Sequence, residues 1–181
     1  KIKEIKENFK VSELYGNELP VYNVLYKQKK AFEKLSNKSN KYIFNCFDIT
    51  LNFIKKNKII GFINCPIAKE FLFRKKYQGI TEFLASRTKR LGNEVMLIFN
   101  KKLAVAPITT HIPIKLVSKN ITKNLITKKI RIINAFYKKF LFKKPNIGVL
   151  GLNPHNHTQL KPFEEKIIIK AINEINKKNP K

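Results

Sequence analysis

Four short, almost wholly apolar runs constrain this sequence more than any other feature. They cover Ile59–Ile63, Val95–Phe99, Leu103–Ile108 and Ile147–Leu152. Apolar runs of this length, bounded by turn residues, are typical of strands that are buried on both faces. The Asn-Lys-Lys segment between the second and third runs indicates a hairpin turn.

The segments between these runs have apolar residues three and four positions apart, and this spacing predicts helices. Residues 1–27 are weakly patterned, and we expect an irregular lead-in with room for one strand. Helices that alternate with short buried strands predict an α/β fold, in which helices cover the faces of a layered sheet. The expected helices are one or two over 28–56 with a break at 36–39, one over 68–75, one that starts near Thr81, one over 120–142 and one over 164–177.

The charge of the chain favours an anionic partner at first. The 181 residues include 38 Lys and Arg against 12 Asp and Glu, which gives a formal net charge of +26. Such a balance is typical of proteins that bind nucleic acid or an anionic surface. Only four of the basic residues are Arg, however, although Arg is the side chain that holds phosphate bidentately. Dispersed Lys together with abundant Asn and Ile favours compositional drift on a solvated surface, so nucleic acid is the less favoured partner.

Cysteine usage and hydropathy indicate the compartment. Cys46 and Cys65 are far apart and form no CxxC pair, which fits a reducing cytoplasm and argues against a disulfide framework or a zinc ribbon. No apolar run reaches membrane-spanning length and no signal peptide is visible, so we expect no membrane partner. The chain begins with Lys and both ends look cut or frayed, which predicts a piece of a longer protein.

Two of the three histidines follow predicted strands. His111 comes after the run Leu103–Ile108 in "TTHIP", and His155 comes after Ile147–Leu152 in "NPH". Because ligands of open α/β sheets bind at the carboxyl ends of strands, the two imidazoles could converge on one metal ion or one anion. The alternative is two ordinary loop histidines. His157 lies in an unpatterned loop and is interpreted as such.

Two further positions are candidates for binding an anion. Thr81, in "GITEF", lies beside a predicted helix N-terminus, where free amides bind phosphate or carboxylate; the alternative is a simple N-cap. Lys69 follows a predicted strand end, where its ammonium could meet an anionic substrate, although a lysine falls there easily by chance. The sequence contains no GxGxxG, P-loop, GxSxG or HExxH motif, so a standard dinucleotide or phosphate fingerprint is absent.

Four segments in order resemble one enzyme family. They read "FINCPIAKE" at 62–70, "GITEFLASRT" at 79–88, "LAVAPITTHIPIKLV" at 103–117 and "GVLGLNPHN" at 148–156, and "FEEKIIIKAI" follows. This pattern is similar to 4-hydroxythreonine-4-phosphate dehydrogenase, an enzyme of pyridoxal 5′-phosphate biosynthesis, from about residue 25 to the end. The tandem of "TTHIP" and "GLNPH" is its most specific part.

The resemblance implies a layered α/β fold like that of the isocitrate and isopropylmalate dehydrogenases, which bind NAD without the glycine fingerprint. It implies oxidation of 4-phosphohydroxy-L-threonine by NAD, followed by decarboxylation, in a homodimer whose subunits share the active site. In that family three histidines hold a divalent metal, such as Zn, Mg or Co. His111 and His155 match two of these ligands, Thr81 matches a substrate contact, and the residues that would bind NAD are left unassigned.

The sequence departs from the family pattern at several points. Ile80 stands where the family has a histidine that contacts the substrate. "NHTQLKP" replaces a Gly-rich stretch, so His157 is not carried over as a ligand. The amino-terminal "GDPxGIGPE" segment and the "HDQ" segment with the third metal histidine have no match, so residues 1–181 are predicted to be the central portion of a two-domain dehydrogenase and inactive alone. A basic nucleic-acid-binding module and a non-catalytic α/β subunit that needs a partner chain remain the alternatives.

Overall fold

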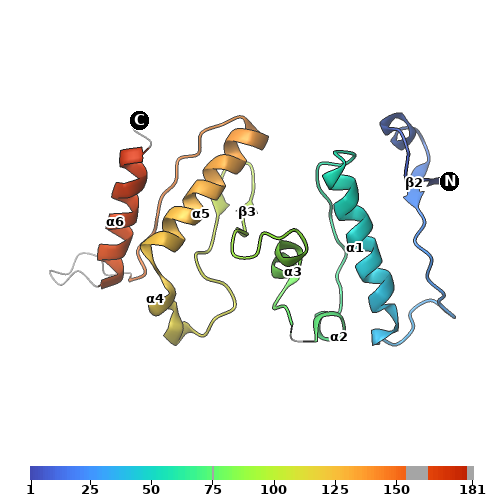
Figure 1. The fold of residues 1–181 in the computed structure, drawn as a ribbon, viewed down its shortest axis with the longest axis horizontal. Helices are drawn as coiled ribbons and strands as arrows, with labels where there is room; N and C mark the ends of the chain where they lie inside the picture. The colour runs from blue at the N-terminus through green and yellow to red at the C-terminus, as the bar shows by residue number, and fades with distance from the viewer. Residues whose placement is uncertain (75, 154–162, 179–181) are drawn as a thin grey trace. The chain divides into compact units, whose positions relative to one another are not determined.

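The computed structural model describes residues 1–74, 76–153 and 163–178. The chain divides into two compact units, Lys1–Gly79 and Ile80–Lys181, and each is described by itself. Helices and short strands occur in both units, so the chain is a mixed α/β protein (Figure 1). No helix among the described residues combines the length and the apolar character needed to cross a membrane.

The first unit has two strands at its beginning and its main helix in the middle. Strands β1 and β2 pair in parallel, with Ile2 opposite Leu19 and Ile5 opposite Tyr22. The expected irregular lead-in therefore contains two paired strands rather than one. The elements of this unit are β1 (Ile2–Ile5), the 3-10 helix η1 (Val11–Leu14), β2 (Leu19–Tyr22), the 3-10 helix η2 (Asn37–Ser39), α1 (Asn40–Lys55) and α2 (Lys69–Phe73).

Aromatic side chains form the core of the first unit. Phe9 and Phe53 pack edge to face with their ring centroids 5.2 Å apart, and Tyr22 meets Phe53 in the same way at 5.4 Å. Ile5 is buried beside them. The ammonium of Lys58 lies 4.7 Å from the centroid of the Phe9 ring, which adds a cation–π contact at the edge of the core.

Helix α1 confirms part of the expected helical region. The predicted break at 36–39 instead holds the start of the helical region, since Ser36 caps η2 by accepting a hydrogen bond from the Lys38 amide and α1 begins at Asn40. Residues 28–35, however, are not helical. Apolar residues alone do not stabilise a helix there, because Phe32 is fully exposed with a φ of 56° and packs against nothing that would hold a helical turn.

The predicted buried strand Ile59–Ile63 is wrong. These residues are neither strand nor helix, and Ile60 and Ile63 are fully exposed, with relative exposures of 101% and 100%. Phe62 does contact the core, through an edge-to-face contact with Phe47 at 6.0 Å. A strand needs a neighbouring backbone to pair with, and among the described residues none pairs with this run.

The second unit has its longest helices, α5 and α6, after a short hairpin. Its helix α6 and most of α5 lie where the apolar spacing predicted them, and α3 begins close to Thr81, as expected. The elements are α3 (Ile80–Arg87), β3 (Ile98–Phe99), β4 (Ala104–Val105), the 3-10 helix η3 (Ile114–Leu116), α4 (Val117–Asn120), α5 (Lys123–Phe136), the π-helix η4 (Tyr137–Leu141) and α6 (Phe163–Lys178).

Helices α5 and α6 pack together through aliphatic side chains. Thr122 caps α5 by accepting a hydrogen bond from the Leu125 amide at 3.1 Å, which satisfies one free donor of the first turn. Glu174 of α6 reaches across to Lys123 at 3.0 Å and Arg131 at 2.9 Å on α5. The buried residues between the helices and at the start of α5 are Ile121, Ile126, Ile130, Ile168, Ala171 and Ile175.

The expected hairpin is confirmed, although its strands are short. Strands β3 and β4 are antiparallel, with Ile98 opposite Val105. The side chain of Asn100 closes the turn, because its Oδ1 accepts hydrogen bonds from the amides of Lys102 and Leu103, both at 2.8 Å. Asn side chains commonly hold turns in this way, which is why the Asn-Lys-Lys segment predicts a hairpin turn.

The layered sheet with helices on its faces is not formed by the described residues. Their strands pair into two separate two-stranded sheets, β1–β2 and β3–β4. The predicted strand Ile147–Leu152 is neither strand nor helix and pairs with no described strand, and Leu150 is 87% exposed. Apolar runs identify segments suited to a sheet, but strand pairing depends on a neighbour that the periodicity of one run does not reveal.

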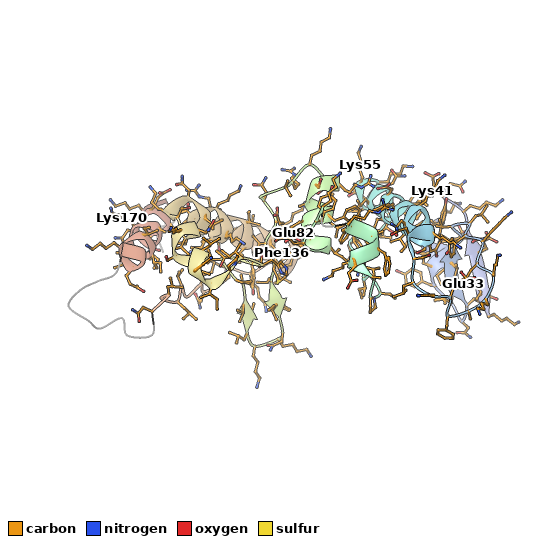
Figure 2. All side chains as sticks on the ribbon, turned by 90° about the horizontal axis from the view of Figure 1, so that it is seen from below. Glu33, Lys41, Lys55, Glu82, Phe136 and Lys170 are labelled. Carbon is orange, nitrogen blue, oxygen red and sulfur yellow. The ribbon has the colours of Figure 1, made fainter. Side chains whose placement is uncertain are left out.

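The lysines lie mostly on solvated surfaces, as their dispersal indicated. Lys41 and Lys55 on α1 and Lys170 on α6 are exposed and project away from the helices that carry them (Figure 2). Their positive charge is therefore spread along helix faces of both units.

Candidate functional site

Helix α3 carries Ile80 and Thr81 in its first turn. The helix begins at Ile80, so Thr81 is its second residue and the predicted N-cap role of Thr81 is wrong. The buried Gly79 precedes the helix and takes the flanking position. Ile80 and Thr81 are both half-buried, and the helix is anchored behind them by the buried Phe83. The amides of this first turn lack intrahelical acceptors and so remain available to an anion.

Glu82 is a neighbour of Thr81 that the sequence did not single out. Its Oε2 is buried and has no hydrogen-bond partner among the described residues. A carboxylate in the first turn interacts favourably with the helix dipole, but it also offsets part of the attraction that the same turn offers to a phosphate. A buried acceptor of this kind is costly unless a donor satisfies it.

His111 lies in the loop after β4, where the sequence predicted it. Its backbone adopts a left-handed conformation with a φ of 57°, which is uncommon for a residue with a side chain, and its side chain is exposed. Strained residues of this kind persist when the surrounding structure holds them, and they cluster at functional sites. The imidazole makes no hydrogen bond to a described residue, so both ring nitrogens are open to a ligand there.

Lys129 of α5 holds the segment that leads from β4 to His111. Its ammonium donates a hydrogen bond to the carbonyl of Pro107 at 3.3 Å, and the next residue, Ile108, packs on the α5–α6 core. Burial lowers the pKa of Lys129, while the nearby Glu94 carboxylate opposes that shift. The sequence gave no signal for this residue, because it is one of many lysines on an amphipathic helix.

Among the described residues, no contact joins Thr81 to His111, and the remaining predicted site residues lie elsewhere. Lys69 is the first residue of α2 and is exposed, and it belongs to the first unit, whereas Thr81 and His111 belong to the second. His155 lies outside the described residues, as does His157. Within residues 1–74, 76–153 and 163–178, His, Cys, Asp and Glu nowhere gather in a group of three that could hold a metal ion.

The described residues therefore offer two separate binding features. Thr81 and the amides around it suit a phosphate or another anion, and His111 presents one exposed imidazole at the end of an anchored loop. One imidazole is a single ligand, whereas a protein metal site commonly takes three or four, so the described residues by themselves do not fit a metal.

Comparisons with known proteins point to one family. The family model described as pyridoxal phosphate biosynthetic protein PdxA matches residues 1–181. A 4-hydroxythreonine-4-phosphate dehydrogenase of Sulfurihydrogenibium sp. strain YO3AOP1 is 32% identical over 203 residues, which covers 86% of this chain and 63% of that protein. Its counterpart in Aquifex aeolicus is 41% identical over 132 residues, 70% of this chain and 40% of that protein.

A solved structure is similar as well. It is described as a 4-hydroxythreonine-4-phosphate dehydrogenase from Salmonella typhimurium, and it matches with a TM-score of 0.79 at 25% identity. The match covers 91% of this chain and 52% of that one. The chain thus spans about half to two thirds of the length of the Salmonella and Sulfurihydrogenibium proteins.

Proposed function

Because the chain belongs to the PdxA family of pyridoxal phosphate biosynthetic proteins, we propose that it is part of an enzyme that oxidises 4-phosphohydroxy-L-threonine with NAD and then decarboxylates the product. The observation that carries this proposal is the family match, which includes every residue from 1 to 181. The relatives named as 4-hydroxythreonine-4-phosphate dehydrogenases support it.

Thr81 is proposed to contact the phosphorylated substrate. It lies in the first turn of α3, where free amides and a hydroxyl can meet an oxyanion. Ile80, in the position of the family histidine, offers an apolar contact instead of a hydrogen bond, which predicts weaker substrate binding than in relatives with the histidine. The net charge of +26 favours the approach of an anionic substrate, as a secondary effect.

His111 is proposed to be a metal ligand, with His155 as the second. A divalent metal, when bound, would lower the pKa of the substrate hydroxyl. The described residues supply one of these two imidazoles, that of His111, and do not fit a metal alone. The structure therefore supports only an account of how the segment before His111 is positioned. Lys129 and Ile108 hold the segment that leads from β4 to the loop of His111. NAD would accept the hydride, at residues that are not assigned.

A homodimer with a shared active site is proposed for the complete enzyme. This proposal is supported by a site that needs further residues, because the described residues include the proposed contact Thr81 and the proposed ligand His111 but no group of three that could hold a metal ion. For the 181-residue chain alone, we expect no measurable reduction of NAD.

The test uses the protein expressed with whatever coding sequence flanks these residues in its gene. With 4-phosphohydroxy-L-threonine and NAD, we expect formation of NADH, and His111→Ala should reduce kcat/KM by about a hundredfold or more, because metal ligands are costly to remove. Lys115→Ala, an exposed change four residues away, is the matched control and should have little effect.

A second variant tests the substrate contact. Ile80→His restores the family residue and should lower KM for the phosphorylated substrate without a large change in kcat, since it adds a ground-state contact. A complete protein that forms no NADH under any of these conditions would instead favour the non-catalytic subunit.

A further inference from the structure

The end of helix α5 and the short helix η4 that follows it expose three phenylalanines. Phe136 is 40% exposed, Phe140 is 53% exposed and Phe142 is 88% exposed. The rings of Phe136 and Phe140 pack against each other with their centroids 5.4 Å apart, so these two side chains form one apolar projection. Single exposed apolar residues are ordinary on a protein surface, but a cluster of large ones is typical of a surface that binds a partner.

Phe142 ends η4 in a conformation that its side chain does not favour. Its φ of 51° is left-handed, and glycine is the usual residue at such a helix end. The ring is also exposed to water, so the fold gains little from it. Phe32 of the first unit shares both features, but it stands beside Glu33, and its ring contacts no other ring of the described residues. Phe32 is therefore a matched comparison for Phe142.

Lysines surround the three rings, and no carboxylate balances them. Lys138 and Lys139 lie within η4, Lys143 and Lys144 follow it, and all four are exposed. Residues 95–163 contain no Asp or Glu. In the part of the chain that the structure describes, none of these four ammonium groups forms an ion pair. The exposed rings thus lie in a local field that is positive.

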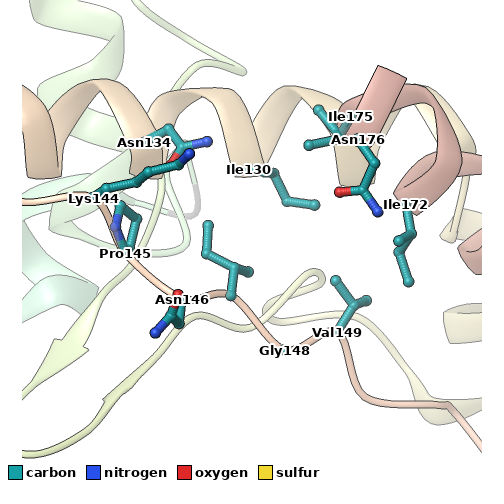
Figure 3. A pocket seen from close by; sticks show the side chains of 11 residues that line it. Ile130, Asn134, Lys144, Pro145, Asn146, Gly148, Val149, Ile172, Ile175 and Asn176 are labelled. Atoms are coloured by element: carbon teal, nitrogen blue, oxygen red, sulfur yellow. The ribbon is translucent and has the colours of Figure 1, made fainter. Parts of the chain in front are cut away.

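The lysines and the rings lie together at the end of α5. The ammonium of Lys139 is 5.2 Å from the centroid of the Phe140 ring. Lys144 and Asn134 both border the groove between α5, α6 and the chain after η4, and Figure 3 shows the Lys144 side chain along α5, next to Asn134. We call this region the aromatic–lysine surface, and it consists of Phe136, Lys138, Lys139, Phe140, Phe142, Lys143 and Lys144.

We propose that the aromatic–lysine surface binds the surface of an anionic lipid bilayer. The phenyl rings would enter the boundary between headgroups and acyl chains, while the ammonium groups remain among the lipid phosphates. Apolar burial and attraction to anionic lipids add to each other in this kind of binding. It needs no spanning segment, so the absence of long apolar runs does not count against it. The proposal does not depend on the proposed enzymatic activity.

A polynucleotide is the other polyanion that a positive surface with aromatic rings attracts. Its bases would stack on the rings, but the Phe140 ring already contacts Phe136 and Lys139, which compete with a base for it. The aromatic–lysine surface also contains no Arg, the side chain that holds a phosphate bidentately. Lysines are sufficient for a bilayer, because that attraction depends on the number of charges near the membrane. The lipid surface is therefore the favoured partner.

The test uses the protein expressed with whatever coding sequence flanks these residues in its gene. Its cosedimentation with vesicles of equimolar phosphatidylglycerol and phosphatidylcholine is compared with that of pure phosphatidylcholine vesicles. We expect binding to the anionic vesicles to be about tenfold stronger or more, because each lysine near the membrane adds attraction. Added salt should weaken this binding, since salt screens exposed charges.

Phe142→Gly separates binding from folding. Glycine suits a φ of 51°, so thermal stability should change little, whereas binding to anionic vesicles should fall by about fivefold or more because the most exposed ring is lost. Phe32→Gly makes the same change at a φ of 56° in the first unit and should leave vesicle binding unchanged. A purely structural role of Phe142 would alter stability and not binding.

A pair of charge reversals tests the lysines. Lys138→Glu combined with Lys139→Glu should abolish binding to the anionic vesicles, because it places carboxylates beside the rings. Lys41→Glu combined with Lys55→Glu, at exposed positions of α1, changes the net charge by the same amount and should leave most of the binding intact. Thermal unfolding checks that both double variants remain folded.

The proposal is overturned if the protein binds neither kind of vesicle, if it binds both alike, or if either control weakens binding as much as its counterpart does. It is also overturned if a single-stranded oligonucleotide displaces the protein from the vesicles and itself fails to bind Phe142→Gly, because the aromatic–lysine surface would then be a nucleic-acid site.

Discussion

In the first unit, the core is formed by Ile5, Phe9 and Phe53, which come from a strand, a loop and a helix, whereas the core of the second unit is formed mainly by aliphatic residues of two facing helices. Aromatic rings in the first unit meet edge to face, so each contact depends on one particular partner. In the second unit, several isoleucines share the buried space. The same chain thus uses a few specific contacts in one unit and distributed packing in the other.

The largest expected effect is in the aromatic core. Phe53→Ala should lower the free energy of unfolding of the first unit by about 3–5 kcal/mol, because Phe53 contacts both Phe9 and Tyr22 and its removal leaves a cavity. Amide hydrogen exchange of α1 measures the loss. Phe53→Leu, which keeps much of the volume, is the control and should cost clearly less. Unchanged protection of α1 in Phe53→Ala would contradict the importance of this one ring.

The equivalent change in the second core should be smaller. Ile126 is 1% exposed, and Ile126→Ala should cost about 2–3 kcal/mol, the lower part of the range for such changes, because half-buried Ile108 and Ile167 can move toward the space. Hydrogen exchange of α5 and α6 measures it. If Ile126→Ala lowered the free energy of unfolding more than Phe53→Ala does, the second core would depend on single residues more than the first.

The ion pairs between α5 and α6 should contribute little. Glu174→Gln removes contacts with Lys123 and Arg131, whose side chains are about half exposed, and should cost roughly 0.5–1 kcal/mol in low salt. The cost should shrink as salt is added, because salt screens exposed charges. Glu7→Gln in the first unit, which breaks the exposed pair with Lys56, is the comparison and should have a still smaller effect. A large, salt-independent cost for Glu174→Gln would mean that helix packing relies on charge.

The smallest effect concerns Lys129 and pH. Burial lowers the pKa of Lys129 in the folded chain, so the unfolded chain binds more protons between that lowered pKa and the ordinary one. Stability should therefore rise with pH through this alkaline window, while below it the penalty of the charged ammonium is fully present. Lys129→Met should remove this part of the pH dependence, measured by urea unfolding across the window. Lys128→Met, an exposed neighbour, is the control and should leave the dependence as it is in the unaltered chain.

Helices were the part of the fold that the sequence predicted best. The spacing of Ile126, Ile130, Ile168 and Ile175 requires only local geometry, since residues three and four apart share one face of a helix. The hairpin was predictable for the same reason, because Asn100 closes its turn through its own neighbours. In contrast, residues 1–27 gave no clear pattern, and their two strands form because each has the other as a partner across the chain.

The sequence located two candidate site residues along the chain, but it did not reveal their setting. The "TTH" pattern placed His111 after a strand, and the "GITE" pattern placed Thr81 at the start of a helix. Neither pattern revealed the left-handed backbone of His111, the hydrogen bond from Lys129 to Pro107, or the buried oxygen of Glu82. These features depend on residues that are distant in sequence or on the packing of the surrounding loop.

The sequence by itself therefore determined the helices, the hairpin turn, the family and the candidate ligand residues, because each depends on short-range spacing or on a local motif. Only the tertiary structure decided that the apolar runs at 59–63 and 147–152 lack a described partner strand, that Thr81 lies inside its helix, and that aromatic rings build one core and isoleucines the other. The physical reason is that strand pairing and edge-to-face packing join residues far apart in the chain, and no local pattern records which distant residue will be the neighbour.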